Sequence, residues 1–173
     1  MDQLNTILKN KSMRTLVYLF LTSVLFAASC EKKDPNPAQF YIRCKIDGQD
    51  YWPNGCANCM RGQLLGDTIF LMNANAGFQS VSIGIIKLDK VPISMMSYIL
   101  DDNLQQNGHY DHSPLVNDIF KTGSTNTGEL KITILDKANK IIAGTFFFKA
   151  YNPIQNKTVS ISNGVFRLKY TDY

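Results

Sequence analysis

Three cysteines that lie close together in the sequence offer the clearest chance of chemistry. Cys56 and Cys59 form a C-x-x-C pair, and Cys44 lies twelve residues upstream of Cys56. Such a set can act as a redox pair, hold a structural zinc ion or form a disulfide. A thioredoxin-like redox pair needs a helix start within a βαβ unit, whereas the Pro-Asn-Gly of residues 53–55 predicts a loop.

A zinc site would need a fourth ligand beyond the three thiolates, and the only histidines are His109 and His112. Residues three apart on a strand point to opposite faces, so these two cannot both serve as ligands. We therefore expect no metal ion and no other cofactor. We expect one disulfide among Cys44, Cys56 and Cys59 with one thiol left over, or three reduced thiols in a reducing habitat. The pairing stays open.

Two further polar clusters could suggest catalysis or ion binding. His109 and Asp111 would share one face of a strand, but no G-x-S-x-G motif accompanies them. Residues 101–108 hold side-chain oxygens before a glycine, but they lack the alternating acids and closing glutamate of a calcium loop. We predict a polar strand edge and a turn, and we expect no enzyme activity.

Cys30 has a different setting from the other cysteines. The chain from Leu16 to Ala28 has thirteen residues without a charge, and three basic residues precede it at positions 9–14. This pattern is typical of a secretory signal and is too short for a comfortable membrane span. Translation from Met1 or from Met13 would keep a basic segment in front of it. The small residues 27–29 before the cysteine resemble the lipobox of bacterial lipoproteins.

This resemblance implies that residues 1–29 are removed and that Cys30 receives a diacylglyceryl thioether, with palmitate-type acylation of the new amino terminus. Two or three acyl chains make membrane attachment effectively stable. Ala27 stands where leucine is usual in the motif. Residues 31–37 are charged and proline-bearing and contain no apolar residue to bury, which predicts that residues 30–38 are a lipidated cysteine followed by a flexible tether.

The composition predicts one globular domain over residues 39–173. The apolar fraction of 45% and the charged fraction of 18% lie near the globular average. Residues 1–29 contain three of the 18 basic and one of the 14 acidic residues, which leaves the remainder a formal charge of +2. So weak a charge, without a Lys/Arg block among aromatics, argues against nucleic-acid binding.

Short runs rich in β-branched and aromatic residues, separated by turn residues, predict an all-β fold. The expected strands cover residues 40–46, 68–75, 80–88, 95–100, 108–112, 118–122, 128–135, 141–151 and 159–170. Short links imply an antiparallel meander of about 8–10 strands that closes as a barrel or as a two-layer sandwich.

For two of these strands the sequence also predicts which side chains face the core. Leu130, Ile132 and Ile134 alternate with polar residues, so we expect all three to face the core. Residues 141–151 are apolar at both parities, which predicts a central strand packed on two sides or a strand that crosses between layers.

Motifs near both ends of the domain show a resemblance to a known group. The motifs are Asp47-Gly48-x-x-Tyr51-Trp52, Gly144-Thr145-Phe146-x-Phe148 and Lys157-Thr158-Val159-x-Ile161-x-x-Gly164-x-Phe166. This pattern is similar to a group of small Bacteroidota lipoproteins of unknown function. The resemblance implies a β domain in the cell envelope and contributes no catalytic residue. Gly144 and Gly164 are interpreted as bend or bulge positions.

We therefore expect a non-enzymatic lipoprotein, anchored to the outer membrane of the bacterial envelope and facing the periplasm or the cell surface. Its membrane contact would be the lipid anchor, and its partner an envelope protein or a glycan. The alternative is a lipocalin-like carrier with an apolar cavity behind Phe146 and Phe148. A metal-dependent or thiol enzyme ranks last.

Two surface features complete the expectations. Aromatic side chains that could bind a ligand, if they are exposed, are Tyr51, Trp52, Phe147, Tyr151 and Tyr173. Asp67-Thr68-Ile69 resembles the short O-glycosylation sequon of Bacteroidota envelopes, so Thr68 is a candidate modification site.

Overall fold

The computed structural model describes residues 39–53, 59–113 and 118–172, and residues 39–173 form one compact unit. The predicted signal segment, Cys30, the tether, Cys56 and Tyr173 lie outside the described residues. The elements are β1 (Tyr41–Ile46), β2 (Gln49–Tyr51), β3 (Met60–Leu65), β4 (Ile69–Ala76), β5 (Gln79–Ile86), β6 (Ser97–Leu100), η1 (Asp102–Leu104), β7 (Gln106–Asp111), β8 (Ile119–Lys121), β9 (Gly128–Asp136), β10 (Ile141–Asn152) and β11 (Lys157–Asp172).

All eleven strands of the described residues belong to one sheet that closes into a ring. The order is β2-β1-β11-β3-β4-β5-β7-β8-β10-β9-β6, and β11 also pairs with β10. The ring therefore runs through β11, β3, β4, β5, β7, β8 and β10. Strands β1 and β2 extend one side of β11, and β9 and β6 extend one side of β10.

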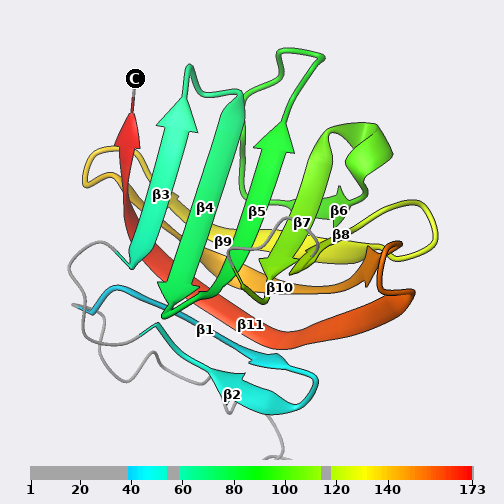
Figure 1. Cartoon of the computed structure of the whole chain (residues 1–173). Helices are drawn as coiled ribbons and strands as arrows, with labels where there is room; N and C mark the ends of the chain where they lie inside the picture. The colour runs from blue at the N-terminus through cyan, green and yellow to red at the C-terminus, as the bar shows by residue number, and fades with distance from the viewer. Residues whose placement is uncertain (1–38, 54–58, 114–117, 173) are drawn as a thin grey trace, which may run out of the picture. The chain divides into compact units, whose positions relative to one another are not determined.

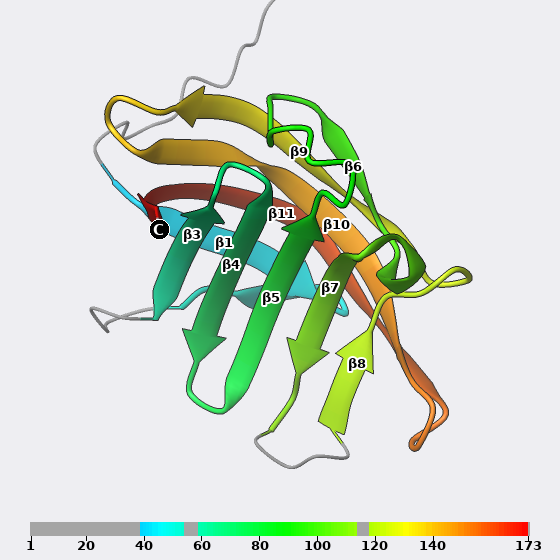
Figure 2. The same ribbon diagram turned by 90° about the horizontal axis from the view of Figure 1, so that it is seen from above.

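The ring is flattened into two layers whose strands cross steeply (Figures 1 and 2). Strands β3, β4, β5, β7 and β8 form one layer, and β1, β11, β10 and β9 run across behind it. The prediction of an all-β fold is confirmed. The strand number exceeds the expected range by one, because β2 and β3 were not predicted as strands.

The interior between the layers is filled by aromatic side chains. Phe146 lies 6.5 Å from Phe148 and 6.4 Å from Phe166 between ring centroids, and Phe166 stacks on Phe70. These four rings are among the largest fully buried side chains of the described residues. The ring of Phe148 also lies where a Cβ on Gly108 would approach it to 2.9 Å. The packing around Phe146 and Phe148 is thus close on several sides.

Bulges change which residues face the core, and one expectation is wrong for this reason. The register of β9 with β10 shifts between Ala143 and Gly144, so the inward alternation of Leu130 and Ile132 does not continue. Ile134 is therefore 41% exposed, and Leu135 packs against the core instead. A second shift in the pairing of β10 with β11 lies beside Gly164. The interpretation of Gly144 and Gly164 as bulge positions is confirmed.

Strand β10 is central, but the first of its two predicted alternatives, packing on both faces, is wrong. It pairs with β11 on one edge and with β9 and β8 on the other. Its outward side chains are nevertheless exposed, and Phe147 is 54% exposed. No second layer covers this face of β10 among the described residues. The pairing of Tyr151 with Lys121 of β8 instead joins the end of β10 to the other layer, in keeping with the alternative of a strand that crosses between layers.

The strand links also depart from a pure antiparallel meander. The end of β11 pairs in parallel with β3, from Tyr170 opposite Gly62 to Asp172 opposite Leu64. This pairing joins the two layers and closes the ring. No helix among the described residues is long and apolar enough to span a membrane.

Candidate binding surfaces

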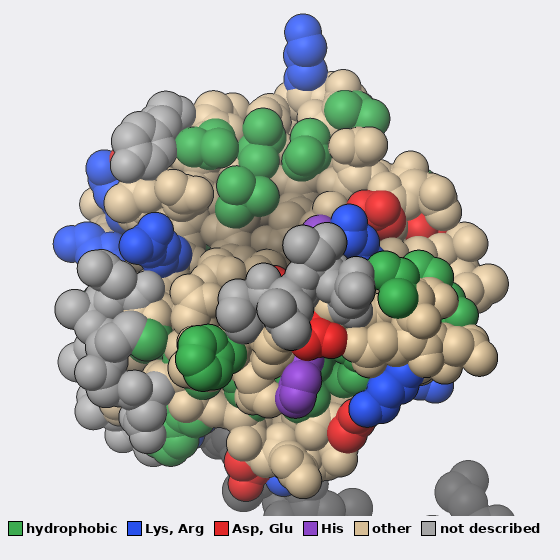
Figure 3. Space-filling view, viewed as in Figure 1, with side chains coloured by type: hydrophobic (Ala, Val, Ile, Leu, Met, Phe, Trp, Pro, Cys, Tyr) green, Lys and Arg blue, Asp and Glu red, His purple; other side chains and the backbone are tan. Residues whose placement is uncertain are grey.

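The outward face of the β3–β4–β5–β7 layer contains a shallow cavity of about 430 Å³, which we call the sheet-face hollow. Figure 3 shows this face hollowed near its centre and lined there mostly by uncharged polar side chains and backbone. Its lining residues are Arg61, Gln63, Leu71, Met72, Asn73, Asn75, Ser82, Ile83, Gly84 and Asn107.

Strand pairing brings these side chains together from distant parts of the chain. Asn73 lies opposite Ser82, and Ser82 lies opposite His109 on the next strand. The amide of Asn73 donates a hydrogen bond of 2.7 Å to the Ser82 hydroxyl. Leu71 and Gly84 lie opposite each other in an adjacent row, and the side-chain ends of Leu71 and Asn107 lie over Gly84. The hollow is the result of small and medium side chains on neighbouring outward positions.

The outward face of the other layer has a different character. On β9 and β10 its outward positions include Glu129, Lys131, Thr145 and Lys149, and the last three are exposed. Long charged side chains of both signs are the usual solution for a strand face in water. The sheet-face hollow instead carries amides, a hydroxyl and one charged residue, Arg61. A strand face that is in contact only with water does not need this set of amide and hydroxyl side chains.

His109 and Asp111 share one face of β7, as predicted, and each has its own surroundings there. Asp111 accepts a hydrogen bond of 2.8 Å from the Ser80 hydroxyl. Within the described part of the chain, the buried Nε2 of His109 has no hydrogen-bond partner. Burial, aided by the nearby charge of Lys121, lowers the pKa of His109 below its ordinary value. His109 is therefore a neutral side chain beside the hollow.

A second, smaller cavity lies at one end of the ring, and we call it the end pocket. Its volume is about 240 Å³. It is lined by Ile46, Asp47, Gln49, Asp50, Tyr51, Gln79, Tyr110, His112, Phe120, Gln155, Lys157 and Val159. His112 lies here and His109 on the outer face, so the prediction that the two histidines point apart is confirmed.

Many polar groups around the end pocket already bind one another. The Tyr110 hydroxyl lies 3.0 Å from Nδ1 of His112, and Asp50 pairs with Lys45 at 2.8 Å. The Tyr51 hydroxyl donates to the carbonyl of Ala74 at 2.7 Å. These contacts fix the shape of the end pocket, and they leave fewer groups to a ligand than its size indicates.

Two of the cysteines differ in oxidation state. Cys44 is a free, buried thiol on β1, and Cys59 is disulfide-bonded. Cys56 lies outside the described residues. No group of three or more His, Cys, Asp or Glu side chains within residues 39–53, 59–113 and 118–172 is placed to hold a metal ion.

The buried thiol gives a testable prediction. Burial raises the pKa of Cys44 from its ordinary value of 9.0 to about 12. Because thiolate is the reactive form, we expect iodoacetamide at pH 8 to alkylate Cys44 at least about a hundredfold more slowly in the folded protein than in urea. Peptide mass spectrometry measures this rate. Equal rates in the two states would contradict the burial.

The same shift predicts how stability depends on pH. A thiol with a raised pKa favours the folded state fully below pH 9 and progressively less as the pH rises toward 12. Burial also raises the pKa of Tyr51, which acts in the same direction at higher pH. We expect the free energy of unfolding to fall above pH 9, and to fall less steeply in Cys44→Val. Urea titrations between pH 7 and pH 11 compare the two proteins.

The remaining predicted positions are spread over the surface. Thr68 is half-buried and directly precedes β4, and its carbonyl accepts a hydrogen bond from Lys87. Of the aromatic candidates, Trp52 is 46% exposed and stacks over Arg43, whereas Tyr51 is buried. Residues 101–104 form the turn that the sequence predicts, with Asp101 capping η1.

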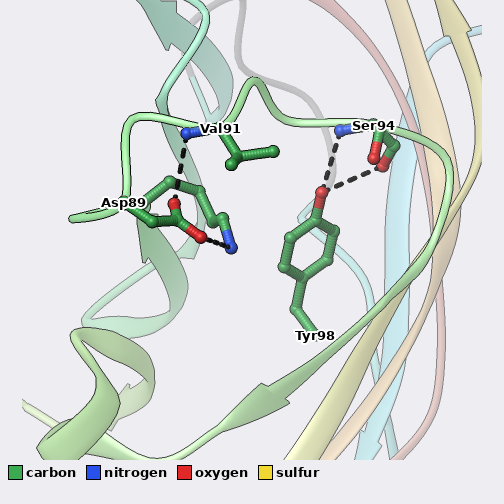
Figure 4. Close-up of polar contacts among 5 residues, drawn as sticks. Asp89, Val91, Ser94 and Tyr98 are labelled. Atoms are coloured by element: carbon green, nitrogen blue, oxygen red, sulfur yellow. Dashed lines mark hydrogen bonds and ion pairs between the residues drawn. The ribbon is translucent and has the colours of Figure 1, made fainter.

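The link between β5 and β6 carries an exposed apolar strip that sequence reasoning missed. Its members are Leu88, Val91, Met95 and Met96. Figure 4 shows how this link is held: Asp89 accepts from the Val91 amide at 3.2 Å, and Tyr98 exchanges hydrogen bonds with Ser94. The strip is therefore an ordered part of the domain.

The fold and its surfaces define an all-β domain with a polar hollow on one sheet face. Residues 56–168 match a domain of unknown function, DUF6252, and the chain belongs to this family. No curated protein and no solved structure matches the chain. The site must therefore be interpreted from its own chemistry.

Proposed function

We propose that this protein is a non-enzymatic, lipid-anchored binding module of the bacterial outer membrane. In this proposal Cys30 carries the anchor, residues 30–38 are the tether, and the sheet-face hollow recognises an envelope component. The observation that carries the proposal is the hollow itself, a shallow cavity of about 430 Å³ on the outward face of the sheet, with both amide and apolar residues in its lining. That volume lies within the range of about 300–1,000 Å³ that is usual for ligand sites.

The carrier alternative has less support. A lipocalin-like carrier needs open volume between the layers, next to Phe146 and Phe148. These two side chains are 2% and 1% exposed and lie against each other, and the ring of Phe148 also lies against Gly108 of the facing layer. Packing of this kind favours recognition at the outer surface.

The anchor is tested by the mass of the mature protein. We expect wild-type protein extracted from membranes to begin at Cys30 and to carry two or three acyl chains. In Cys30→Ser the acyl mass should be absent and residues 1–29 should remain attached, because the processed cysteine is lost. Cys44→Ser is the matched control and should keep the anchor. A wild-type protein without acyl mass at Cys30 would refute the anchored state.

The hollow is tested by filling it. A Cβ on Gly84 would lie 3.1 Å from Oδ1 of Asn107 and 3.3 Å from Cδ2 of Leu71, both at the ends of side chains that can move. Gly84→Val should therefore fold and occupy the hollow. We expect the processed protein in detergent micelles to bind delipidated envelopes, and Gly84→Val to bind at least about tenfold more weakly, which corresponds to 1.4 kcal/mol.

Delipidated envelopes are used so that the acyl chains cannot insert into a bilayer. Thr145→Val is the matched control, because Thr145 is an exposed strand residue on the outward face of the other layer. Its binding should stay within about twofold of wild type. Equal binding by wild type and Gly84→Val would show that the hollow is not the recognition site.

A further inference from the structure

We propose that the ligand of the sheet-face hollow is a neutral glycan chain that lies across β3, β4, β5 and β7. This inference rests on the proposed function and names the class of its ligand. Four features of the described residues support it: the polar chemistry, the low charge, the pairing of the strands and the apolar floor.

The polar chemistry of the hollow matches sugar hydroxyl groups. Gln63, Asn73, Asn75 and Asn107 each carry an amide with two donor hydrogens and an acceptor oxygen. A hydroxyl is one donor and two acceptors, so a row of amides can bind neighbouring hydroxyls in both senses. Within the described ranges, the side chains of Gln63 and Asn75 have no hydrogen-bond partner. These two amides are available to a ligand.

The low charge argues against an ionic polymer. Arg61 is the one charged residue that lines the hollow. A nucleic acid or a polyanionic glycan gains most of its affinity from several Lys or Arg contacts, and a cationic partner needs several carboxylates. Asp111 and His109 lie outside the lining, and Asp111 is already bound to Ser80. The hollow therefore suits a neutral chain.

The strand pairing argues against a peptide that binds by adding a strand. Such a peptide needs an edge with free N–H and C=O groups. β4 pairs with β3 and β5 along its length, and β5 pairs with β4 and β7. Because the backbone groups of β4 and β5 are already paired, a ligand on this face can contact only side chains. A sugar that lies flat on a sheet binds in this way.

The floor offers a surface for the C–H face of a sugar ring. Leu71 and Gly84 lie opposite each other at the centre of one row across the four strands, and Gln63 and Asn107 lie at the two ends of that row. The polar row of Asn73 with Ser82 lies beside it. The side chains of Leu71 and Asn107 close over Gly84, and the Asn73–Ser82 hydrogen bond holds two of the polar groups in place before binding. Groups that are fixed in advance lose less entropy on binding.

The test uses purified neutral oligosaccharides as probes. Processed protein in detergent micelles is titrated with cellohexaose, maltohexaose and chitohexaose and is followed by saturation-transfer NMR, with heparin as the charged comparison. We expect at least one neutral probe to bind at millimolar concentration or below. Gly84→Val should weaken this binding at least about tenfold, and Thr145→Val should stay within about twofold.

A second variant guards against misfolding of Gly84→Val. Asn73→Ala removes the amide without adding volume, and we expect about a fivefold loss of affinity, in line with the loss of one hydrogen bond. Far-ultraviolet circular dichroism and thermal melting confirm that each variant is folded. Unchanged glycan binding in both folded variants would overturn the inference.

Chemical treatment of envelopes separates this inference from the proposed function. Periodate, which cleaves neighbouring diols in sugars, should abolish binding to delipidated envelopes, and protease treatment should leave it intact. If protease abolishes binding while Gly84→Val still weakens it, the glycan inference is overturned and the hollow remains the recognition site for a protein. If no neutral probe binds and periodate has no effect, the glycan inference is likewise wrong.

Discussion

Replacing Phe148 with alanine should lower the free energy of unfolding by about 3–5 kcal/mol. The side chain is 1% exposed and joins the two layers, since its ring stacks on Phe146 within one layer and lies against Gly108 of the other. Removing the ring leaves a cavity that neighbours on two crossing layers cannot close. Urea denaturation followed by circular dichroism measures the loss.

The next residue along the chain is the control. Phe147 points outward and is 54% exposed, so Phe147→Ala should change the free energy of unfolding by no more than about 0.5 kcal/mol. A comparable loss in both variants would show that β10 does not alternate between core and solvent. Such a result would instead support packing of β10 on both faces, which is one of the two alternatives that its composition predicts.

The contact between the layers can be isolated in a double-mutant cycle. Gly108→Ala places a methyl group where the Phe148 ring lies, and overpacking of this kind costs about 1–3 kcal/mol. In the presence of Phe148→Leu the same methyl group has more room. We expect the two substitutions together to cost less than the sum of their separate effects, because they share one contact.

Sequence patterns predicted most strands because the apolar side chains alternate within them. Strands β4, β5, β7 and β11 lie within two residues of the predicted ranges at most of their ends, and Val159, Ile161, Phe166 and Leu168 face the core as expected. The change of parity between Ile161 and Phe166 already indicates a bulge. Alternation is a local property, so a sequence displays it directly.

Properties that depend on pairing were not predictable in the same way. β3 has the sequence MRGQLL, which contains no β-branched residue, and it is a strand because β4 and the end of β11 pair with its two edges. Ile134 faces outward because a bulge in the pairing of β9 with β10 shifts the alternation by one residue. Both outcomes depend on partners that are distant in the sequence.

In the candidate site, too, some features follow from local sequence patterns and others depend on strand pairing. The outward polar residues were visible as alternating letters, for example Asn73 and Asn75, or Ser80 and Ser82. Register alone sets Asn73, Ser82 and His109 in one row across three strands. The absence of lysine and glutamate from these positions was the available signal, since solvent-facing strands normally carry them. Uncharged amides and hydroxyls on such a face form no charged or catalytic motif in the sequence.

Replacing Gly144 with alanine should lower the free energy of unfolding by about 3 kcal/mol or more. A Cβ at this position would lie 2.0 Å from the carbonyl oxygen of Lys131 and 2.9 Å from Cε1 of Phe166. The first contact is with backbone, so the bulge between β9 and β10 must shift to make room. The second contact drives a core ring from its position. Urea denaturation measures the loss of stability.

Gly123→Ala is the matched control for this substitution. A Cβ on Gly123 meets no atom within 4 Å, so the new methyl group has open space. We expect an unchanged or slightly higher stability, by up to about 1 kcal/mol, because alanine restricts the unfolded chain more than glycine does. If Gly144→Ala were as stable as Gly123→Ala, the close approach of Lys131 at the bulge would be wrong. The bulge at Gly144 would then not explain which side chains of β9 face the core.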